Sequence, residues 1–282
     1  MTHPARLLAA ALIAALLAPL SGCVTNAATG RSQFNALSRE EEIQMGTEAG
    51  PQLAAEYGGV YQNAAVQAYI AEVGNKLASK TEADYPSLPW EFTLLDSDVI
   101  NAFSLPGGKV FISLGLAKQF TDESELAGVL GHEIGHVVAE HIDKRVAAQT
   151  GWTGFTAVAG AVAGYSGSSI VAEVVPMVVS QTGQGFLMKW GRDEEYESDE
   201  LGVRYMVLAG YDPMGQVRVM EVLRDSMEGS RSPEWLSTHP YPENRIKNLE
   251  AYIKKNYSEY VDNPANGTYE ARFKSRFLDQ IK

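Results

Sequence analysis

The stretch of sequence that decides the fold reads His132-Glu133-Ile134-Gly135-His136 and lies in a largely apolar run. On an α-helix, residues four apart share one face and lie one turn apart. Two imidazoles at this spacing can bind one metal ion, and the carboxylate beside the first can reach a water molecule on that metal. The stretch therefore predicts a helix that carries two metal ligands and a general base, Glu133.

The helix around this motif is expected to begin near Thr121 or Asp122, because Glu125 is placed to complete a capping box there. Its apolar residues recur at helical spacing, with the two histidines on the other side. This stripe consists of Leu126, Leu130, Ile134 and Val137. The pattern predicts a helix with one face in the core and one face on a cleft.

The motif needs a third protein ligand, because zinc in hydrolases usually has three and keeps a fourth position for water. One scheme extends the motif along the same helix and requires glycine at 139 and histidine at 142. This chain has Ala139 and Ile142, so that scheme fails. His141 comes one residue too early, and we expect it on the surface or in contact with a ligand rather than on the metal.

The second scheme takes a carboxylate from a later helix. Glu195 and Asp199 are four apart and share a face, and Asp199 is placed to accept the other N–H of a ligating histidine. Spacing alone does not choose Glu195 over Glu194 or Glu197, and an acidic helix surface would explain the same residues.

Composition indicates an ordinary globular protein: of 282 residues, 45% are hydrophobic and 21% charged. The length allows one large domain or two small ones. A net charge of −12 argues against a nucleic-acid partner, whose phosphates need a basic surface. The chain has a single cysteine, which excludes an internal disulfide.

The N-terminus resembles a bacterial lipoprotein signal. A basic start and an apolar run over 7–18 precede Leu20-Ser21-Gly22-Cys23. We expect residues 1–22 to be a removed signal peptide, Cys23 to be lipidated and residues 23–37 to be a tether. Val24 stands where lipoproteins of this type carry an aspartate for inner-membrane retention, which favours the outer membrane. An ordinary signal peptide with an incidental cysteine is the alternative.

The rest of the chain predicts a mostly helical α+β fold in one domain, residues 38–260, followed by a tail of uncertain order, 261–282. The uncharged stretch 146–172 contains many glycines, and we favour a lid or buried hairpin over a membrane span. Helices are expected over 38–56, 63–80, 114–119, 192–209, 213–228 and 243–256, and strands over 90–95, 101–105 and 109–113.

Four segments in this order resemble the metallopeptidase family of the heat-shock protease HtpX, the CAAX prenyl proteases and the periplasmic proteases BepA and LoiP. They span about 145 residues, and the N-terminus makes exported lipoproteins similar to LoiP the nearest members. Ser198 departs from the family's usual alanine. The segments are Asn101-Ala102-Phe103 with Gly107-Gly108, the His-Glu-x-x-His motif, Glu195 to Asp199, and Thr238-His239-Pro240 with Arg245.

The resemblance implies a zincin-like fold with a small β-sheet beside the active-site helix, and one zinc ion held by His132, His136 and Glu195. It implies that Asp199 orients a ligand and that His239 lies at the site. There His239 would act either as a hydrogen-bond donor to the transition state or as an extra metal ligand that closes the site.

The remaining matched residues are expected to serve the substrate or the frame of the site. Arg245 either acts at the site or simply pairs with a carboxylate in the C-terminal part. The residues expected to bind substrate are Asn101, Ala102, Phe103, Gly107 and Gly108, on an edge strand and its turn. A plain core hairpin is compatible with the same residues.

Together these features predict a zinc endopeptidase anchored by lipid at the periplasmic face of the outer membrane. Recognition through the substrate main chain predicts loose specificity, so we expect unfolded or misassembled envelope proteins as substrates. Two alternatives remain: a zinc-stabilised periplasmic chaperone or outer-membrane assembly factor with little proteolysis, and a lipoprotein with a fortuitous motif.

Overall fold

The computed structural model describes residues 23–148, 171–172, 175–176, 190–228, 233–240 and 242–281. The expected signal peptide and most of the uncharged stretch after 146 lie outside these residues. Within the described parts of the chain, no helix has the length and apolar character needed to cross a bilayer.

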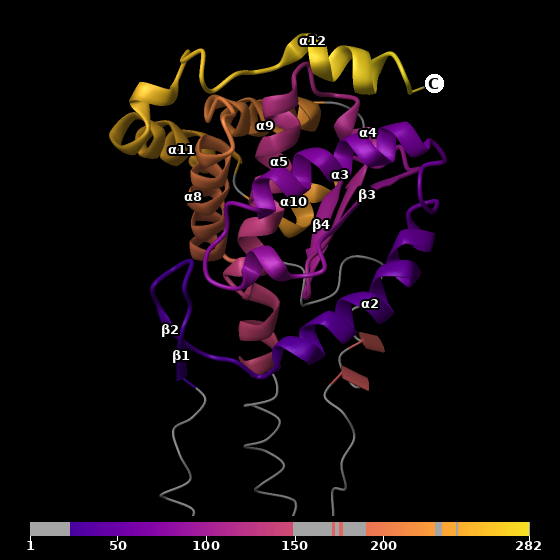
Figure 1. The fold of residues 1–282 in the computed structure, drawn as a ribbon, viewed down its shortest axis with the longest axis vertical. Helices are drawn as coiled ribbons and strands as arrows, with labels where there is room; N and C mark the ends of the chain where they lie inside the picture. The colour runs from indigo at the N-terminus through magenta and orange to yellow at the C-terminus, as the bar shows by residue number, and fades with distance from the viewer. Residues whose placement is uncertain are drawn as a thin grey trace, which may run out of the picture.

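The architecture is α+β and mostly helical, as predicted (Figure 1). The long helices are α2 (Arg39–Glu56), α3 (Ala64–Ala78), α5 (Glu123–Val138), α8 (Arg192–Leu208), α9 (Met214–Asp225) and α11 (Pro242–Asn256). Short helices are α4 (Leu114–Ala117), α10 (Trp235–Thr238) and α12 (Glu270–Phe273), which a π-helical turn at Lys274–Leu278 continues. Short 3-10 turns lie at Tyr85–Ser87, Ser226–Glu228 and Ser258–Tyr260, and residues 141–148 are also helical.

A three-stranded sheet lies beside α5, with the strand order β3-β5-β4. β3 (Glu91–Leu95) runs parallel to β5 (Lys109–Ser113), and β4 (Ala102–Leu105) is antiparallel to β5 and forms an edge. Alternate residues face opposite sides. Val110 and Ile112 join the core built by α3 and α5, whereas Phe103 and Phe111 join a second core beneath α2.

Helix α5 is the centre of the molecule, and every residue from Glu123 to Val138 is buried. The prediction of a single buried stripe was wrong, because α8 and α9 cover the side opposite the sheet. Glycines on α5 permit this close packing. A Cβ on Gly135 would come 2.9 Å from the Cα of Ser198, and one on Gly131 would come 3.3 Å from the Cα of Gly202, both on α8.

Three of the predicted helix ends are confirmed, the starts of α2 and α5 and the end of α8. Asp122 caps α5 and forms a capping box with Glu125, and Ser38 forms the corresponding box with Glu41 at the start of α2. Gly210, with φ of +77°, follows the end of α8 in the left-handed conformation that favours glycine.

The segment 23–37, expected to be a free tether, differs from that expectation. β1 (Cys23–Thr25) pairs with β2 (Ser32–Phe34), and we call this unit the N-terminal hairpin. Its Asn26 is buried, and Nδ2 donates to the carbonyl of Val138 at 2.8 Å. The carboxylate of Glu140 accepts hydrogen bonds from Gln33 and Asn35. These buried polar contacts hold the segment on the domain.

The C-terminal segment is also part of the fold. Phe273 and Phe277 are fully buried in the main core, and Arg272 pairs with the buried Glu123 at the start of α5. Figure 1 shows α12 at the end of the molecule opposite the N-terminal hairpin. Polar composition concealed these anchors, because only a few apolar side chains make the contact.

Candidate metal centre

Four side chains from three parts of the chain meet in the buried centre of the molecule. α5 supplies His132 and His136, α8 supplies Glu195, and His239 follows directly after α10. One ligand atom from each lies within 4.8 Å of all the others, and all four residues are buried.

The distances between these atoms match the coordination shell of a small metal ion. The Nε2 atoms of His132 and His136 are 3.0 Å apart. Nδ1 of His239 lies 3.2 Å from His132 Nε2 and 2.9 Å from Glu195 Oε1, which is 3.5 Å from His136 Nε2. Ligands about 2.1 Å from a tetrahedral zinc are about 3.4 Å apart. The donor set therefore fits one zinc ion.

The protonation of these ligands also suits a metal. Burial lowers the pKa of His136 well below its ordinary value, which favours the neutral imidazole that binds metals. Burial alone would raise the pKa of Glu195, but the neighbouring Arg245 and His239 lower it well below the usual range. Glu195 is therefore held as a carboxylate.

The structure decides among the three candidate glutamates. Glu195 is the one whose carboxylate joins the two histidines. Glu194 pairs instead with Arg145 at 2.7 Å, and Glu197 accepts from His141 Nε2 at 3.0 Å. Sequence spacing alone leaves these three glutamates open, because it does not show which turn of α8 packs on α5.

Asp199 and Arg245 lie in contact with the clustered residues. Asp199 Oδ1 lies 3.0 Å from Nδ1 of His132, so the ring can present Nε2 to the other ligands. Arg245 is fully buried and pairs with both Asp199 and Glu195. Burial alone would lower the pKa of Arg245, but the two carboxylates raise it.

Glu133 lies beside the cluster, where three side chains surround its carboxylate. Ser104 Oγ on β4 donates to Oε2 at 3.0 Å, and Trp235 Nε1 donates to Oε1 at 3.4 Å. Nε2 of His239 is 3.7 Å from Oε1. The base is thus fixed between the edge strand and the segment that carries His239.

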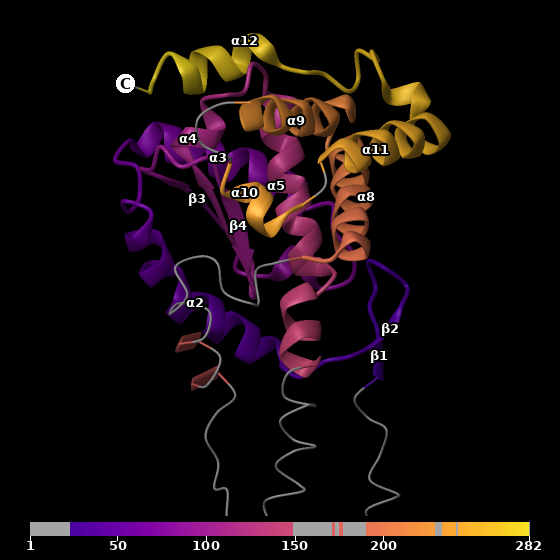
Figure 2. The same ribbon diagram turned by 180° about the vertical axis from the view of Figure 1, so that it is seen from behind.

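The segment with His239 contains the helical turn α10 (Figure 2). Two backbone hydrogen bonds hold it: Trp235 N–H to Ile100 O at 3.2 Å and Trp190 N–H to Thr238 O at 2.9 Å. The ring of Trp235 stacks on His239 with centroids 4.3 Å apart. His239 is therefore placed among the ligands by packing.

The three residues expected to bind substrate at β4 lie next to this segment. Asn101 precedes the strand, and its Nδ2 donates to the hydroxyl of Tyr57 at 3.0 Å. Ala102 is buried in the main core, and Phe103 stacks on Phe111 in the second core, with centroids 4.9 Å apart. Asn101 and Phe103 also line a small pocket beside His239.

Gly107 and Gly108 form the turn between β4 and β5, with φ of +74° and +87°. A Cβ on Gly107 would come 2.5 Å from the Cα of Ile43, and one on Gly108 would come 3.2 Å from the ring of Trp90. The positive φ angles of the turn account for both glycines, and the close approach of α2 adds to the requirement at Gly107.

Several residues at the site were not predicted. The sequence could have indicated Ser104, because the alternation of a strand places its side chain on the same face as that of Ala102, which was expected to bind substrate. Of the two positions expected for His141, contact with a ligand is the one observed, since His141 is fully buried and contacts His136. No sequence pattern indicated Trp190 or Trp235, which stack on His136 and His239.

Comparison with known proteins agrees with this geometry. The model of peptidase family M48 matches residues 64–253, which contain all four clustered residues and Glu133.

Individual relatives point the same way. The β-barrel assembly-enhancing protease of Escherichia coli (strain K12) is 31% identical over 231 residues, covering 77% of this chain and 45% of that protein. The mitochondrial metalloendopeptidase OMA1 of Arabidopsis thaliana is 31% identical over 163 residues, covering 57% of this chain and 31% of that protein. OMA1 of Schizosaccharomyces pombe is 28% identical over 229 residues, covering 80% of this chain and 65% of that protein. The chain thus spans less than half the length of the Escherichia coli protein.

Proposed function

We propose that this chain, which belongs to peptidase family M48, is a zinc metalloendopeptidase that cleaves unfolded or misassembled proteins of the bacterial cell envelope. The observation that carries the chemistry is the carboxylate of Glu133 beside a buried cluster of three histidines and a glutamate. The proposed substrate class rests on the Escherichia coli relative, whose name describes a protease that enhances β-barrel assembly.

In the proposed reaction, His132, His136 and Glu195 hold the zinc ion. When bound, zinc supplies the positive charge that makes a water molecule acidic and polarises the scissile carbonyl. Glu133 takes the proton from the attacking water and delivers it to the leaving amine. Ser104 and Trp235 keep the carboxylate aimed at the cluster, and Asp199 and Arg245 keep the ligands in place.

Of the two roles open to His239, the distances support that of an extra ligand. Its Nδ1 lies among the donor atoms, in the position that a catalytic zinc site keeps for water. We propose that this arrangement is a closed resting state, and that substrate binding displaces His239.

The substrate is proposed to pair with the edge of β4 that faces away from β5, where no strand pairs in the described part of the chain. Ala102 and Ser104 alternate with the residues that bond to β5, so their backbone groups point toward that edge. The Oδ1 of Asn101 is buried and has no partner among the described residues, which leaves it available to a main-chain N–H of the substrate. Main-chain pairing supports loose sequence specificity.

The test is cleavage of a denatured outer-membrane β-barrel protein, with the same protein folded in detergent as the comparison. The zinc-loaded wild type should cut the denatured form and spare the folded form, as seen by gel and mass spectrometry. Glu133→Gln should bind one zinc per chain but leave both forms intact. If wild type and Glu133→Gln cleave neither form, or if Glu133→Gln supports envelope function fully, the chaperone or assembly role replaces proteolysis.

We also propose a lipid anchor at Cys23, as in exported lipoproteins similar to LoiP. Cys23 lies on β1 opposite Phe34, which is 57% exposed, so an acyl chain there would bring an apolar side chain to the membrane surface. Cys23→Ser should move the protein from the outer-membrane fraction to the soluble periplasmic fraction. Unchanged membrane fractionation of that variant would contradict the anchor.

A further inference from the structure

His141 is a fully buried histidine just beyond the end of α5 that the reaction described above does not use. Its Nδ1 lies 2.7 Å from Nδ1 of His136, and its Nε2 lies 3.0 Å from Oε2 of Glu197. Trp190 covers both imidazoles, stacking on His136 with centroids 4.4 Å apart and lying 5.9 Å from His141. His136, His141 and Glu197 therefore form one line of polar contacts from the metal centre to α8.

This line fixes where the protons lie. The Nε2 of His136 faces the other ligands, so metal binding needs its lone pair there and a proton on Nδ1. That proton needs an acceptor, and the neighbour within reach is Nδ1 of His141. His141 can accept only if its own proton is on Nε2, where the carboxylate of Glu197 accepts it.

The other histidine ligand is supported differently. His132 donates to Asp199 directly, within the Glu-x-x-x-Asp spacing of α8. His136 reaches its carboxylate through a second imidazole, and that carboxylate is Glu197, two residues before Asp199 on the same helix. One helix thus orients both histidine ligands, through two carboxylates that lie within one turn.

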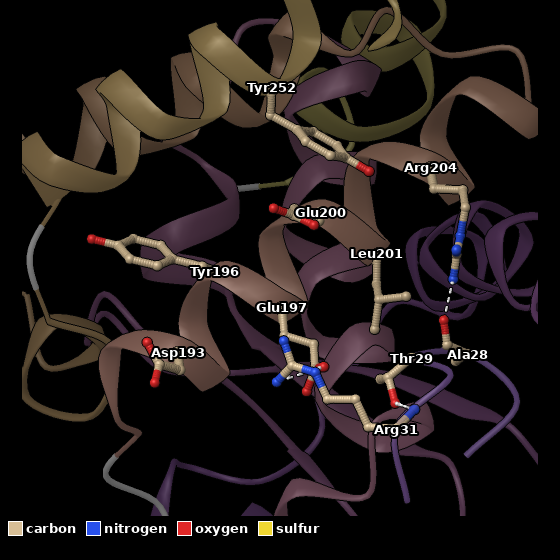
Figure 3. Close-up of a pocket in the computed structure, with 10 residues that line it drawn as sticks. All are labelled: Ala28, Thr29, Arg31, Asp193, Tyr196, Glu197, Glu200, Leu201, Arg204 and Tyr252. Carbon is tan, nitrogen blue, oxygen red and sulfur yellow. Dashed lines mark hydrogen bonds and ion pairs between the residues drawn. The ribbon is translucent and has the colours of Figure 1, made fainter. Parts of the chain in front are cut away.

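The outer end of the line reaches the surface. Glu197 is held by Lys144 Nζ at 3.4 Å and by Arg31 Nη1 at 3.3 Å. Figure 3 shows Arg31 extending from the N-terminal hairpin to Glu197 at the edge of a surface pocket of about 520 Å³. Two cations favour the ionised carboxylate, which makes it the stronger acceptor.

We propose that His141 and Glu197 are positioning residues that hold His136 in the tautomer and orientation required for zinc. They act through His136 and do not touch the substrate. The proposal rests on the metal centre alone, so it stands or falls separately from the choice of substrate.

The test is the zinc affinity of the full chain, measured by competition with a chromophoric zinc chelator. His141→Phe keeps an aromatic ring beside Trp190 but removes the acceptor, and it should weaken zinc binding about 10- to 100-fold. His141→Asn keeps an acceptor near the Nδ1 position and should recover most of the affinity. Thermal unfolding of the metal-free proteins reports whether each variant folds.

Glu197→Ala provides a second, milder variant, with Glu200→Ala as its control on the same helix and at the same pocket. Glu197→Ala should weaken zinc binding by about tenfold, and Glu200→Ala should leave it unchanged. Wild-type zinc affinity in a folded His141→Phe protein would overturn the proposal. If His141→Phe does not fold, wild-type affinity in Glu197→Ala overturns it instead.

Discussion

Arg245 donates two parallel hydrogen bonds to Asp199, from Nε to Oδ2 at 2.8 Å and from Nη2 to Oδ1 at 2.5 Å. Its third donor, Nη1, binds Glu195, so a single buried cation pairs with two buried carboxylates. Asp199 also accepts from Gln216 at 2.8 Å, which completes its contacts. Bidentate arginine–carboxylate pairs of this kind combine charge with geometric precision.

Arg245→Met should destabilise the metal-free protein by about 3–5 kcal/mol, because it leaves two buried carboxylates without their cation. Added zinc should restore part of this loss, since it binds the folded state and brings positive charge. Urea unfolding with and without zinc measures both effects. The control is Arg224→Met, which removes an exposed pair with Asp225 and should leave the stability nearly unchanged. Equal stability of the two variants would show that the buried network contributes nothing.

Ser104→Ala should lower kcat by about tenfold and leave KM and zinc affinity unchanged. The hydroxyl of Ser104 donates to Glu133 at 3.0 Å, and a hydrogen bond to a charged group contributes on the order of 1.5 kcal/mol. Steady-state cleavage of an unfolded substrate separates the two kinetic constants. Ser104→Thr keeps a hydroxyl and should stay near wild type. A change confined to KM would instead assign Ser104 to substrate binding on β4.

The parts of the fold that could be predicted from sequence are those held by local contacts. The capping boxes at Ser38 and Asp122 join residues three apart, so their signatures appear directly in the chain. The two histidines of α5 are equally local, since one helical turn separates them. Such local signals predicted the mostly helical α+β class and the first two metal ligands, His132 and His136.

The remainder depends on which surfaces pack together, and spacing does not encode that. What distinguishes Glu195 from its acidic neighbours is the rotation of α8 against α5. The close contact between Gly135 and Ser198 sets that rotation. His141 became part of the centre because α5 ends and the chain turns at Glu140, whose φ is +55°. The N-terminal hairpin and α12 were missed because a few buried side chains anchor segments of polar composition.

Glu42→Gln should make the stability of the protein less dependent on pH. Burial raises the pKa of Glu42 to about 8, although Arg39 opposes the shift. Between pH 4.5 and 8 the folded state then binds more protons than the unfolded state, so wild-type stability falls as the pH rises. The stability advantage of the variant over wild type should therefore be larger at pH 8 than at pH 4.5, by on the order of 4 kcal/mol.

Urea unfolding at a series of pH values measures this slope. Glu40→Gln is the matched control, since it changes an exposed acid in the same helical turn and should keep the wild-type slope. Burial also raises the pKa of Asp143, to about 6, so some dependence should persist in Glu42→Gln. Parallel slopes for all three proteins would mean that Glu42 does not titrate in this range.

His239→Ala should increase cleavage of unfolded protein on the order of tenfold while weakening zinc binding. Nδ1 of His239 fills the fourth position of the donor cluster, so a substrate must first displace it. In the wild type, molecules in the closed state do not cleave substrate, so the measured rate is lower than that of the open state. Removing His239 removes the closed state and therefore raises the measured rate. Initial rates at saturating zinc measure the gain.

Thr238→Ala is the control, because it loses only the hydrogen bond to Trp235 O in α10 and keeps the imidazole. If His239→Ala instead cleaves more slowly than wild type at full zinc occupancy, then His239 acts as a donor to the transition state, and the buried cluster represents the working site rather than a closed one.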